Sequence, residues 1–480
     1  MSATTHSKDV KYPANWISIQ FGEIFELSYG KSLTKKNRNP SGGKFPVYGS
    51  NGVVDYHSKY LVDGPVIIVR RKGAAGAVSF SSENCWPIDT TYFVKPSTYL
   101  DIRFCYYVIK SLRLAQFEKS TAVPGLSRDD AYDLVVNIPP FKEQKRIVAK
   151  TEELFSELDN GIESLRTARE QLKVYHQAIL KHAFEGKLTA QWRAHKEGQI
   201  ESAECLLARI KEEREGHSTR LSTRRTRKCF TDFSSDEQER LPQLPFGWVW
   251  AQLGSLFEVV SGATPKGVEQ VKGASIPYYK VSDMNTLGNE TRMSVAALYL
   301  SEEERDDLRL TTYPEGTVIF PKRGGAILTN KKRMLSRPSC FDLNTMGVIN
   351  TLRSISTDYL WHWFQKLDLS RIYDGSNVPQ INNKNVEPLP FPLCSLAEQK
   401  EIVEILEEKL SVVGQLRLDI ELELEKAEAL RHSILKKAFS GKLVAQDPDD
   451  EPASILLERI KAEKAETENG KMKIKRTAAA

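Results

Sequence analysis

The sequence predicts an α+β protein, in which two β-rich α+β domains are separated by two long helices that form an antiparallel intramolecular coiled coil. Three observations support this fold class. A unit of about 240 residues occurs twice in the 480-residue chain, which gives a pseudo-two-fold internal repeat. Each copy begins with short β-branched runs between glycine-rich turns. Each copy ends with a long segment whose apolar residues recur every seven positions.

The composition places the chain among soluble cytoplasmic proteins. Hydrophobic residues make up 40% of the chain and charged residues 27%, which predicts buried cores rather than disorder. No apolar run approaches the ~20 residues that cross a bilayer, and the N-terminus has no apolar stretch, so no membrane contact is expected. The six cysteines lie far apart without a C-x-x-C pair, which favours reduced thiols over zinc or disulfides.

The internal repeat is visible as two series of matching residues. The first series runs from Pro13-x-x-Trp16 through Gly22 and Phe25-Glu26 to Gly30, and it recurs 232 positions later, from Pro245 to Gly262. The second series recurs with a displacement of 255 and includes Glu143-Gln144-Lys145 with Glu398-Gln399-Lys400, and Gly186-Lys187-Leu188 with Gly441-Lys442-Leu443. So many identities at the same spacing indicate a duplication.

The better-matched half of each copy is predicted to form the coiled coil. Pro139-Pro140 prevents an earlier start of the first helix, and Gly186 or Gly441 provides the C-terminal stop. About 45 residues at ~1.5 Å each correspond to a rod of ~65–70 Å. A helix that lies on its own domain remains the alternative. The apolar stripes are Leu158, Leu165, Leu172 and Ile179 in the first helix, and Val413, Ile420, Ala427 and Ile434 in the second.

The variable half of each copy is predicted to be a β-rich α+β domain. Short runs such as Val66–Val69, Thr91–Val94 and Thr317–Phe320 indicate strands, and helical patches are expected near Ile102–Glu118 and Tyr359–Ile372. The predicted boundaries are 1–140 for the first variable domain, 141–214 for a central helical spacer, 215–240 for a linker, 241–395 for the second variable domain, 396–466 for a C-terminal helical spacer, and 467–480 for a basic flexible tail.

Motifs of catalysis are incomplete in this sequence. Gly30-Lys31-Ser32 lacks the first glycine of a phosphate-binding loop, since Phe25 stands in its place. Glu143-x-Lys145 resembles half of a nuclease metal site, but such a site needs an Asp on a neighbouring strand. Because Glu143 and Glu398 open long helices, stabilisation of the helix N-terminus explains them better. We therefore expect no catalytic residue, no metal and no cofactor on this chain.

Basic loops in both variable domains point to a polyanionic partner. The net charge is only +5, but Lys and Arg cluster in loops interleaved with tyrosines, and such side chains clamp phosphates and read base edges. Arg71 and Arg323 follow the aligned glycines Gly64 and Gly316. Solvated surface charge is the alternative for any single residue. The candidate DNA-binding residues are Lys31, Lys35, Lys36, Arg38, Tyr48, Arg70, Arg71, Lys72, Lys266, Lys272, Tyr279, Lys280, Lys322, Arg323, Lys331, Lys332 and Arg333.

These motifs together resemble the specificity (S) subunit of Type I restriction-modification systems. The resemblance rests on Pro-x-x-Trp-x5-Gly-x2-Phe-Glu from Pro13, on Ile-Pro-Pro-x-x-Glu-Gln-x-x-Ile at Ile138–Ile147, and on Ala-Phe-x-Gly-Lys-Leu at Ala183–Leu188. It covers nearly the whole chain in both copies. The second copy departs from it at 393–396, where Leu-Cys-Ser-Leu replaces the proline pair.

The resemblance implies that the variable domains are two target-recognition domains, each of which reads half of a split DNA target. Because the two variable halves differ in sequence, we expect the two half-sites to differ and the target to be asymmetric. The helices would set the half-site spacing, and ~10 bp between half-site centres would let both domains face the protein side of the duplex. The non-catalytic chain would be present as one copy per complex and recruit two methyltransferase (M) subunits, which use S-adenosylmethionine, and restriction (R) subunits, which use ATP and Mg²⁺. A stand-alone DNA-modifying or DNA-cleaving enzyme, and a coiled-coil scaffold without DNA contact, are the alternative hypotheses.

Overall fold

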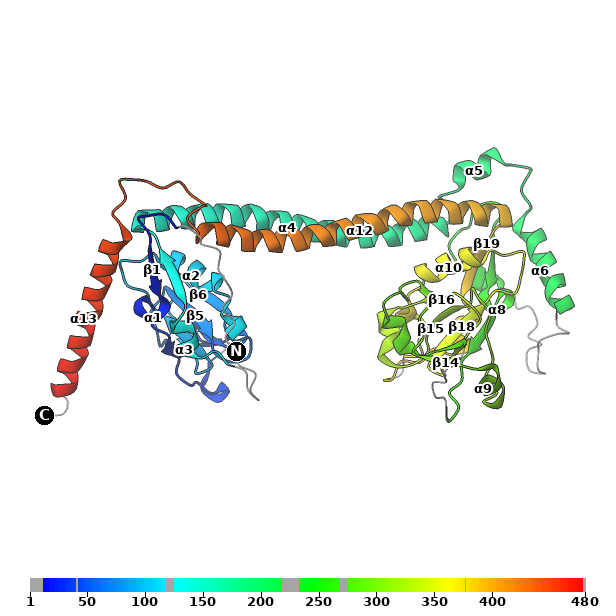
Figure 1. The fold of residues 1–480 in the computed structure, drawn as a ribbon. Coiled ribbons are helices and arrows are strands. Elements are labelled where there is room, and N and C mark those ends of the chain that lie inside the picture. Colours follow the sequence, from blue (N-terminus) through cyan, green and yellow to red (C-terminus); the bar gives the residue numbers. More distant parts are fainter. Residues whose placement is uncertain are drawn as a thin grey trace. The chain divides into compact units, whose positions relative to one another are not determined.

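The computed structural model describes residues 12–39, 42–117, 125–217, 233–267, 275–375 and 377–477. It divides the chain into two compact units, in which unit 1 comprises residues 1–167 and 420–480 and unit 2 comprises residues 168–419 (Figure 1). Each unit therefore combines one variable domain with segments from both copies of the repeat. Within the described ranges, no helix combines the length and apolar character that a membrane span requires.

Unit 1 contains three small sheets. The strand orders are β1-β9, β2-β8-β5-β6 and β4-β3-β7. The pairs β2·β8, β8·β5 and β5·β6 are antiparallel, whereas β3 and β7 are parallel. The elements are β1 (Ile17–Gln20), α1 (Phe21–Ile24), β2 (Ser28–Tyr29), β3 (Phe45–Gly49), β4 (Gly52–His57), β5 (Val66–Arg70), β6 (Val78–Ser81), β7 (Trp86–Pro87), β8 (Thr91–Val94), α2 (Ile102–Ser111), α3 (Arg128–Tyr132) and β9 (Val135–Ile138).

Unit 2 repeats this topology with one additional strand. Its strand orders are β10-β19, β11-β18-β15-β16-β13 and β14-β12-β17, so β13 is the addition at the end of the largest sheet. The elements are β10 (Val249–Gln252), α8 (Leu253–Leu256), β11 (Glu258–Ser261), β12 (Ile276–Tyr279), β13 (Arg292–Met293), β14 (Leu298–Leu300), α9 (Glu302–Asp307), β15 (Val318–Pro321), β16 (Arg333–Leu335), β17 (Cys340–Phe341), β18 (Thr345–Ile349), α10 (Thr357–Lys366), α11 (Asn383–Val386) and β19 (Pro390–Leu393).

Two long helices, α4 (Phe141–Ala183) and α12 (Leu396–Ala438), each begin in one unit and end in the other. α4 starts directly after the proline pair, as predicted. α12 starts at the equivalent position although it lacks the prolines, because the Ser395 hydroxyl accepts the backbone N–H of Glu398 at 3.1 Å and caps the first turn.

Within each unit the start of one long helix packs beside the end of the other, so the pairing is antiparallel. In unit 1, Phe155 of α4 packs with Ile434 and Leu435 of α12, and Arg431 pairs with Asp159. In unit 2, Leu172 and Ile179 of α4 join a core that includes Ile402, Leu406 and Val413 of α12. None of the eight predicted stripe residues is exposed. The predicted fold class is therefore confirmed.

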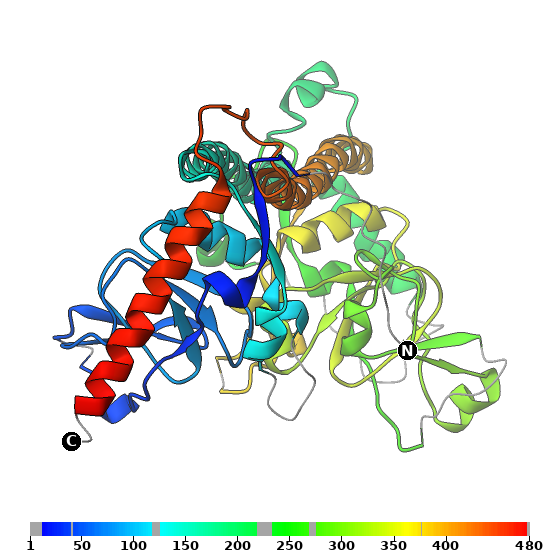
Figure 2. The ribbon, with the colours of Figure 1, turned by 60° about the vertical axis from the view of Figure 1, so that its left-hand side comes forward.

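A further helix follows each long helix and lies on the unit where that long helix ends. In unit 1, α13 (Ala453–Thr477) contributes Leu456 and Ile460 to the core, and Figures 1 and 2 show it beside the sheets. In unit 2, α6 (Ala203–His217) contributes Leu206 and Ile210. The helix α13 runs to Thr477, so most of the segment 467–480, predicted as a flexible tail, has a helical backbone. Two short helices, α5 (Ala190–His195) and α7 (Ser235–Glu239), lie between α4 and β10.

The core of unit 2 contains a histidine that burial keeps neutral. His362 of α10 is 7% exposed, and its Nδ1 has no hydrogen-bond partner among the described residues. Burial lowers its pKa from the usual 6.5 to about 4, while the carboxyl of Asp358 opposes this shift and His176 of α4 adds to it. The neutral ring is therefore the form that the folded unit tolerates.

Unit 2 should lose stability as the pH falls from about 6.5 towards 4. The pKa of His362 is depressed in the folded state, so the unfolded chain binds the proton first, and the contribution lost is at most about 3 kcal/mol. Urea unfolding between pH 7.5 and 4.5, followed through a probe in unit 2, should show this slope. The slope should flatten in His362→Gln, and an equal slope in both proteins would exclude His362 as its cause.

Candidate nucleic-acid interface

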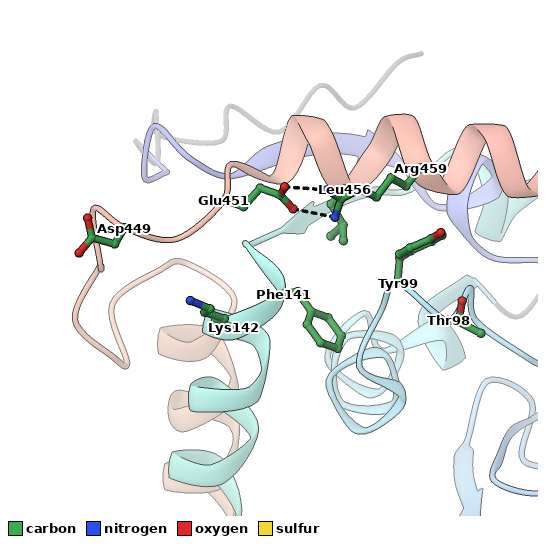
Figure 3. Close-up of a pocket in the computed structure, with 8 residues that line it drawn as sticks. All are labelled: Thr98, Tyr99, Phe141, Lys142, Asp449, Glu451, Leu456 and Arg459. Atoms are coloured by element: carbon green, nitrogen blue, oxygen red, sulfur yellow. Dashed lines mark hydrogen bonds and ion pairs between the residues drawn. The ribbon is translucent and has the colours of Figure 1, made fainter.

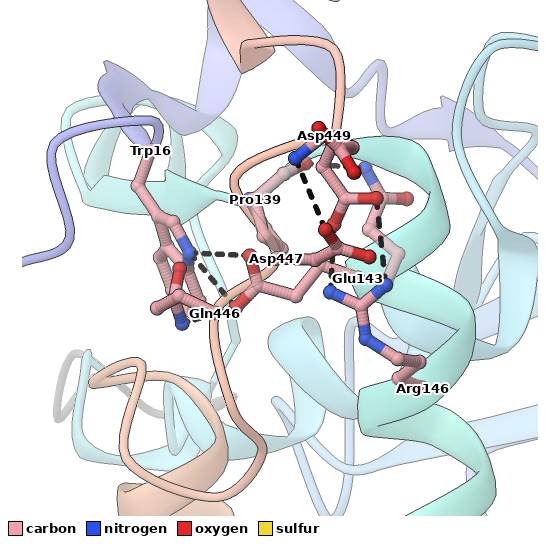
Figure 4. A network of polar contacts seen from close by, with 9 residues as sticks. Trp16, Pro139, Glu143, Arg146, Gln446, Asp447 and Asp449 are labelled. Atoms are coloured by element: carbon pink, nitrogen blue, oxygen red, sulfur yellow. Dashed lines mark hydrogen bonds and ion pairs between the residues drawn. The ribbon is translucent and has the colours of Figure 1, made fainter.

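In each unit, the tryptophan of the Pro-x-x-Trp motif contacts a buried glutamate at the start of a long helix. We call this contact the carboxylate node. In unit 1, the Trp16 indole donates to both carboxylate oxygens of Glu143, at 3.1 and 3.0 Å, and Gln446 Nε2 donates to Oε1 at 2.7 Å. Figure 4 shows Arg146 one turn further along α4 than Glu143. Its guanidinium pairs with the Asp450 carboxylate at 2.6 Å. Burial raises the pKa of the Glu143 carboxyl above its usual range. The node joins the start of α4 to the segment that follows α12.

Unit 2 contains an equivalent carboxylate node with a different arrangement of charge. The Glu398 carboxylate is buried and accepts hydrogen bonds from the Trp248 indole at 2.9 Å and from the Thr189 hydroxyl at 2.7 Å. Arg193 forms an ion pair with the same carboxylate at 3.1 Å. The tryptophan of the repeat motif Pro-x-x-Trp and the glutamate of the Glu-Gln pair thus contact each other in both units, a contact that sequence reasoning missed.

The glycine after each long helix completes the node. Gly186 has a φ of +66° and Gly441 a φ of +72°, which a side chain would strain. A Cβ atom at Gly186 would lie 2.4 Å from Pro245 Cγ, and one at Gly441 would lie 2.5 Å from Pro13 Cγ. Each glycine therefore stops its helix, as predicted, and also lets the proline of the other repeat approach.

Replacing Gly186 by alanine should lower the free energy of unfolding by about 1–3 kcal/mol, because the new Cβ meets Pro245 in a left-handed backbone conformation. Thermal unfolding measures the loss. Gly414→Ala is the matched control, since no atom lies within 4 Å of a Cβ there and the position is inside α12. It should stabilise by about 0.5–1 kcal/mol. Two variants with equal melting temperatures would show that the approach of Pro245 carries no energy.

The predicted basic residues of unit 1 gather in part at one end of the sheet β2-β8-β5-β6. Because β2 and β5 both run antiparallel to β8, the residues after β2 and after β5 meet at the same edge, which we call the strand-end edge. Lys31 and Lys72 are exposed there, and Arg70 and Arg71 are half-buried. Lys35 and Lys36 are exposed in the loop that follows, whereas the Arg38 guanidinium lies 3.8 Å from the Asp55 carboxylate.

The corresponding edge of unit 2 carries Lys322 and Arg323. Arg323 is exposed, and Lys322 Nζ donates to Ser261 Oγ at 2.9 Å. Lys266 and Lys280 are also exposed, whereas Lys272 lies outside the described residues. Lys331 donates to Asn285, and the Arg333 guanidinium donates to the carbonyl oxygens of Lys332 and Met284.

Three predicted contact residues lie in the interior. Tyr48 is buried within a core cluster of unit 1, and Tyr279 is fully buried, with its hydroxyl donating to Met293 O at 2.9 Å. Burial raises the pKa of Tyr279 to about 12. Lys332 is 4% exposed, its ammonium donates to Leu367 O at 2.5 Å, and burial lowers its pKa to about 8. These three side chains are held inside the domains and are not part of the surface that we propose below.

The backbone corrects the predicted equivalence of Arg71 with Arg323. Leu126 N–H donates to Arg71 O at 3.0 Å, and Ile381 N–H donates to Lys322 O at 2.9 Å. The backbone of Lys72 forms an isolated antiparallel β-bridge with Gly125, and the backbone of Arg323 forms the same bridge with Gln380. Arg71 therefore matches Lys322, and Lys72 matches Arg323, one position away from the alignment on the preceding glycines.

Unit 1 also contains a small pocket, of about 280 Å³, between α13, the start of α4 and the loop at Thr98 and Tyr99 (Figure 3). Its arginine, Arg459, forms two hydrogen bonds with the Glu451 carboxylate, at 2.8 and 2.7 Å, and Asp449 lies on the same wall. The cationic charge is thus matched by acids, which does not suit a polyanion. Among the described residues, no three His, Cys, Asp or Glu side chains gather as a possible metal site.

The structure thus defines a class of two-domain proteins in which a duplicated α+β unit is joined to paired antiparallel helices and exposes cations at its strand-end edges. The chain belongs to the family of the Type I restriction modification DNA specificity domain, which it matches over residues 13–173 and 245–424. It is thus a member of the specificity subunits, the non-catalytic component of Type I restriction-modification systems.

The chain is also similar to curated relatives in sequence and to solved structures in fold. The chain is 22% identical to the Type I restriction enzyme EcoDI specificity subunit of Escherichia coli, over 95% of this chain and 96% of the relative. It is 21% identical to the StySPI specificity subunit of Salmonella potsdam, over 95% and 96%. The fold is similar to a chain from a study of type I R-M complex assembly, with a TM-score of 0.64 at 15% identity, covering 90% of this chain and 99% of that one. It is also similar to the HsdS subunit from Thermoanaerobacter tengcongensis, with a TM-score of 0.50 at 16% identity, covering 90% and 98%.

Proposed function

We propose that this specificity subunit reads an asymmetric bipartite target in double-stranded DNA, with the first predicted variable domain (1–140) contacting one half-site and the second (241–395) the other. The observation that carries the proposal is the duplicated topology with unlike side chains at equivalent positions of the strand-end edge, such as Arg71 and Lys322. Because the two units share one topology, we expect them to dock on DNA in the same way. Because their side chains differ at equivalent positions, we expect them to prefer different bases.

The exposed cations of the two variable domains support contact with the phosphate backbone. Lys31, Lys35, Lys36 and Lys72 in unit 1, and Lys266, Lys280 and Arg323 in unit 2, are all solvent-exposed. Cations that neutralise phosphates release counterions, so binding weakens as salt is raised. Arg70, Arg71 and Lys322 are half-buried beside them, which suits side chains that are held in fixed positions rather than extended into solvent.

The long helices are proposed to dock two methyltransferase (M) subunits and to set the distance between half-sites. Large apolar side chains stand exposed on them, and those four residues apart, such as Val412 and Leu416, share one helix face, which suits a surface that a protein partner covers. On α4 they include Tyr175, which is 51% exposed, and on α12 they include Leu418, which is 55% exposed. The remaining members are Val174, Val412, Leu416, Leu422 and Leu430.

The chemistry is proposed to reside on the partners, in the cytoplasm where the DNA is found. The M subunits would bind S-adenosylmethionine and methylate adenine. The restriction (R) subunits would use ATP and Mg²⁺ to translocate and cleave DNA. One copy of the specificity subunit in each complex would direct both reactions to the target.

The test is DNA binding by the full chain in complex with its M subunits, at physiological salt, against a library of duplexes with two randomised half-sites. One preferred bipartite site is expected, with an affinity at least a thousand-fold above that for random DNA. Binding that is indifferent to sequence would overturn the proposal.

Charge reversal at Lys72 and Arg323 should weaken binding to all sequences, because both cations are proposed to contact phosphates. Unchanged affinity would favour a scaffold that does not touch DNA.

A further inference from the structure

An exposed tyrosine lies against two arginines at the strand-end edge of unit 1. Tyr29, the last residue of β2, has 49% of its side chain exposed. The guanidinium carbon of Arg71 is 5.4 Å from the centre of its ring, and that of Arg128, in α3, is 4.7 Å away. The buried ring of Tyr92 lies 5.0 Å from the Tyr29 ring. The phenol is therefore held in place by three neighbours and still open to solvent.

Among the residues that the structure describes, no carboxylate pairs with the two guanidinium groups beside Tyr29. Within the described part of the chain, neither Arg71 nor Arg128 has a carboxylate oxygen within 4.0 Å, and Arg71 Nε is buried without a hydrogen-bond partner. Leaving a buried cationic donor unpaired costs free energy, which a ligand with acceptor atoms would recover. Both guanidinium groups are therefore without an ionic partner in the described ranges and are suited to an anionic or polar ligand.

Unit 2 has the same three positions with different side chains. Ser261 ends β11 before the repeat glycine Gly262, as Tyr29 ends β2 before Gly30. Lys322 matches Arg71 through the backbone contacts described above. Asn383 lies two residues after Ile381, as Arg128 lies two residues after Leu126, and each opens a short helix.

The side chains at these positions also meet in unit 2. Lys322 Nζ donates to Ser261 Oγ at 2.9 Å, which parallels the approach of Arg71 to Tyr29. The Asn383 amide is exposed and donates to Val259 O, in the same strand as Ser261, at 3.1 Å. One geometry thus presents a phenol with two guanidinium groups in unit 1, and a hydroxyl with an ammonium and an amide in unit 2.

Building on the proposed function, we infer that these three positions in each unit, which we call the reading positions, contact base edges and determine which bases each domain prefers. Guanidinium groups pair with the O6 and N7 atoms of guanine, and an Asn amide pairs with the N6 and N7 atoms of adenine. The set Tyr29, Arg71 and Arg128 therefore favours guanine in the first half-site. The set Ser261, Lys322 and Asn383 favours a site that includes adenine.

Single substitutions in unit 1 test this inference in the complex of the full chain with its M subunits. The binding of duplexes that vary one base at a time in the first half-site is measured for Arg71→Lys and Arg128→Lys. Both variants keep the positive charge but lose the paired donors, so a base contact predicts a loss of about ten- to hundred-fold for the preferred duplex and a relaxed preference at one base. If both variants bind every duplex with the affinity and base preference of the wild-type complex, the two arginines do not contact bases, and the inference is overturned.

Transfer of the whole set gives a second, independent readout. The triple variant Tyr29→Ser, Arg71→Lys, Arg128→Asn carries the side chains of unit 2, and its preferred first half-site should change while the second stays the same. Lys95→Ala is the control, because Lys95 is exposed and its ammonium lies 3.8 Å from the Asp63 carboxylate. Melting temperatures verify that each variant is folded.

The outcomes separate the two proposals. A wild-type complex with a bipartite preference, and variants with that same preference, would leave the proposed function intact and refute the reading positions. A wild-type complex without any preference would refute both. A changed first half-site in the triple variant, with an unchanged preference in Lys95→Ala, is the result that we expect.

Discussion

Replacing Glu398 by glutamine should lower the stability of unit 2 by about 3–5 kcal/mol. The carboxylate is 2% exposed and is the counter-ion of Arg193, whose guanidinium lies 3.1 Å away. The glutamine amide keeps the volume of the side chain but leaves the half-buried Arg193 guanidinium without an anion. Removing one partner of a buried ion pair destabilises the fold strongly, because the remaining charge is buried without compensation. The amide also presents N–H groups to the donors Thr189 and Trp248. Urea unfolding followed by tryptophan fluorescence measures the loss, because five of the seven tryptophans, Trp248 among them, lie in unit 2.

Glu143→Gln is the matched control for this prediction. The donors to the Glu143 carboxylate are the neutral Trp16 indole and the Gln446 amide, and the nearby Arg146 has its own carboxylate in Asp450. A glutamine oxygen still accepts the indole N–H, and the Gln446 amide can turn to offer its oxygen. We therefore expect a loss of only about 1 kcal/mol. Equal losses in the two variants would show that the charge of Arg193 contributes nothing to the node.

The duplication and the long helices could be predicted because they leave periodic signals in the sequence. The apolar stripes at Leu158–Ile179 and Val413–Ile434 need no knowledge of partners, and the proline pair marks the start of the first helix. The role of Glu143 and Glu398 could not be predicted beyond a preference for the first turn. The carboxylates bind indoles that lie 127 and 150 positions away, and only the folded chain brings these residues together.

The exposure of the candidate interface residues could be predicted only in part. Lysines in loops, such as Lys31 and Lys72, are exposed as expected, whereas Tyr279 and Lys332 lie inside. A strand of four residues, such as β12, carries too little alternation to show which face is buried. Tyr29 and Arg128 were missed because they are about 100 positions apart. The position of Tyr29 directly before a repeated glycine was the one available signal.

The preferred gap between half-sites should increase by one or two base pairs when both long helices are lengthened by four residues. The insertions are placed after Thr167 in α4 and after Asp419 in α12. Four residues add ~6 Å and turn one end of the paired helices by ~40° relative to the other. One or two base pairs add ~3–7 Å and turn the duplex by ~35–70°. The rise and the rotation therefore change together in protein and DNA. Selection from duplexes with variable gaps, by the variant in complex with its M subunits, measures the shift.

An insertion of seven residues at the same two positions separates rise from rotation. It adds ~10 Å, which suits three base pairs, and it keeps the apolar stripes in register. However, it turns the ends by only ~20°, whereas three base pairs turn the duplex by ~100°. The two domains would then face different sides of the DNA, so we expect at least a ten-fold loss of affinity at every gap. If both insertions leave the wild-type gap preferred, the helices do not set the spacing, and the flexibility of the domains on their helices must do so instead.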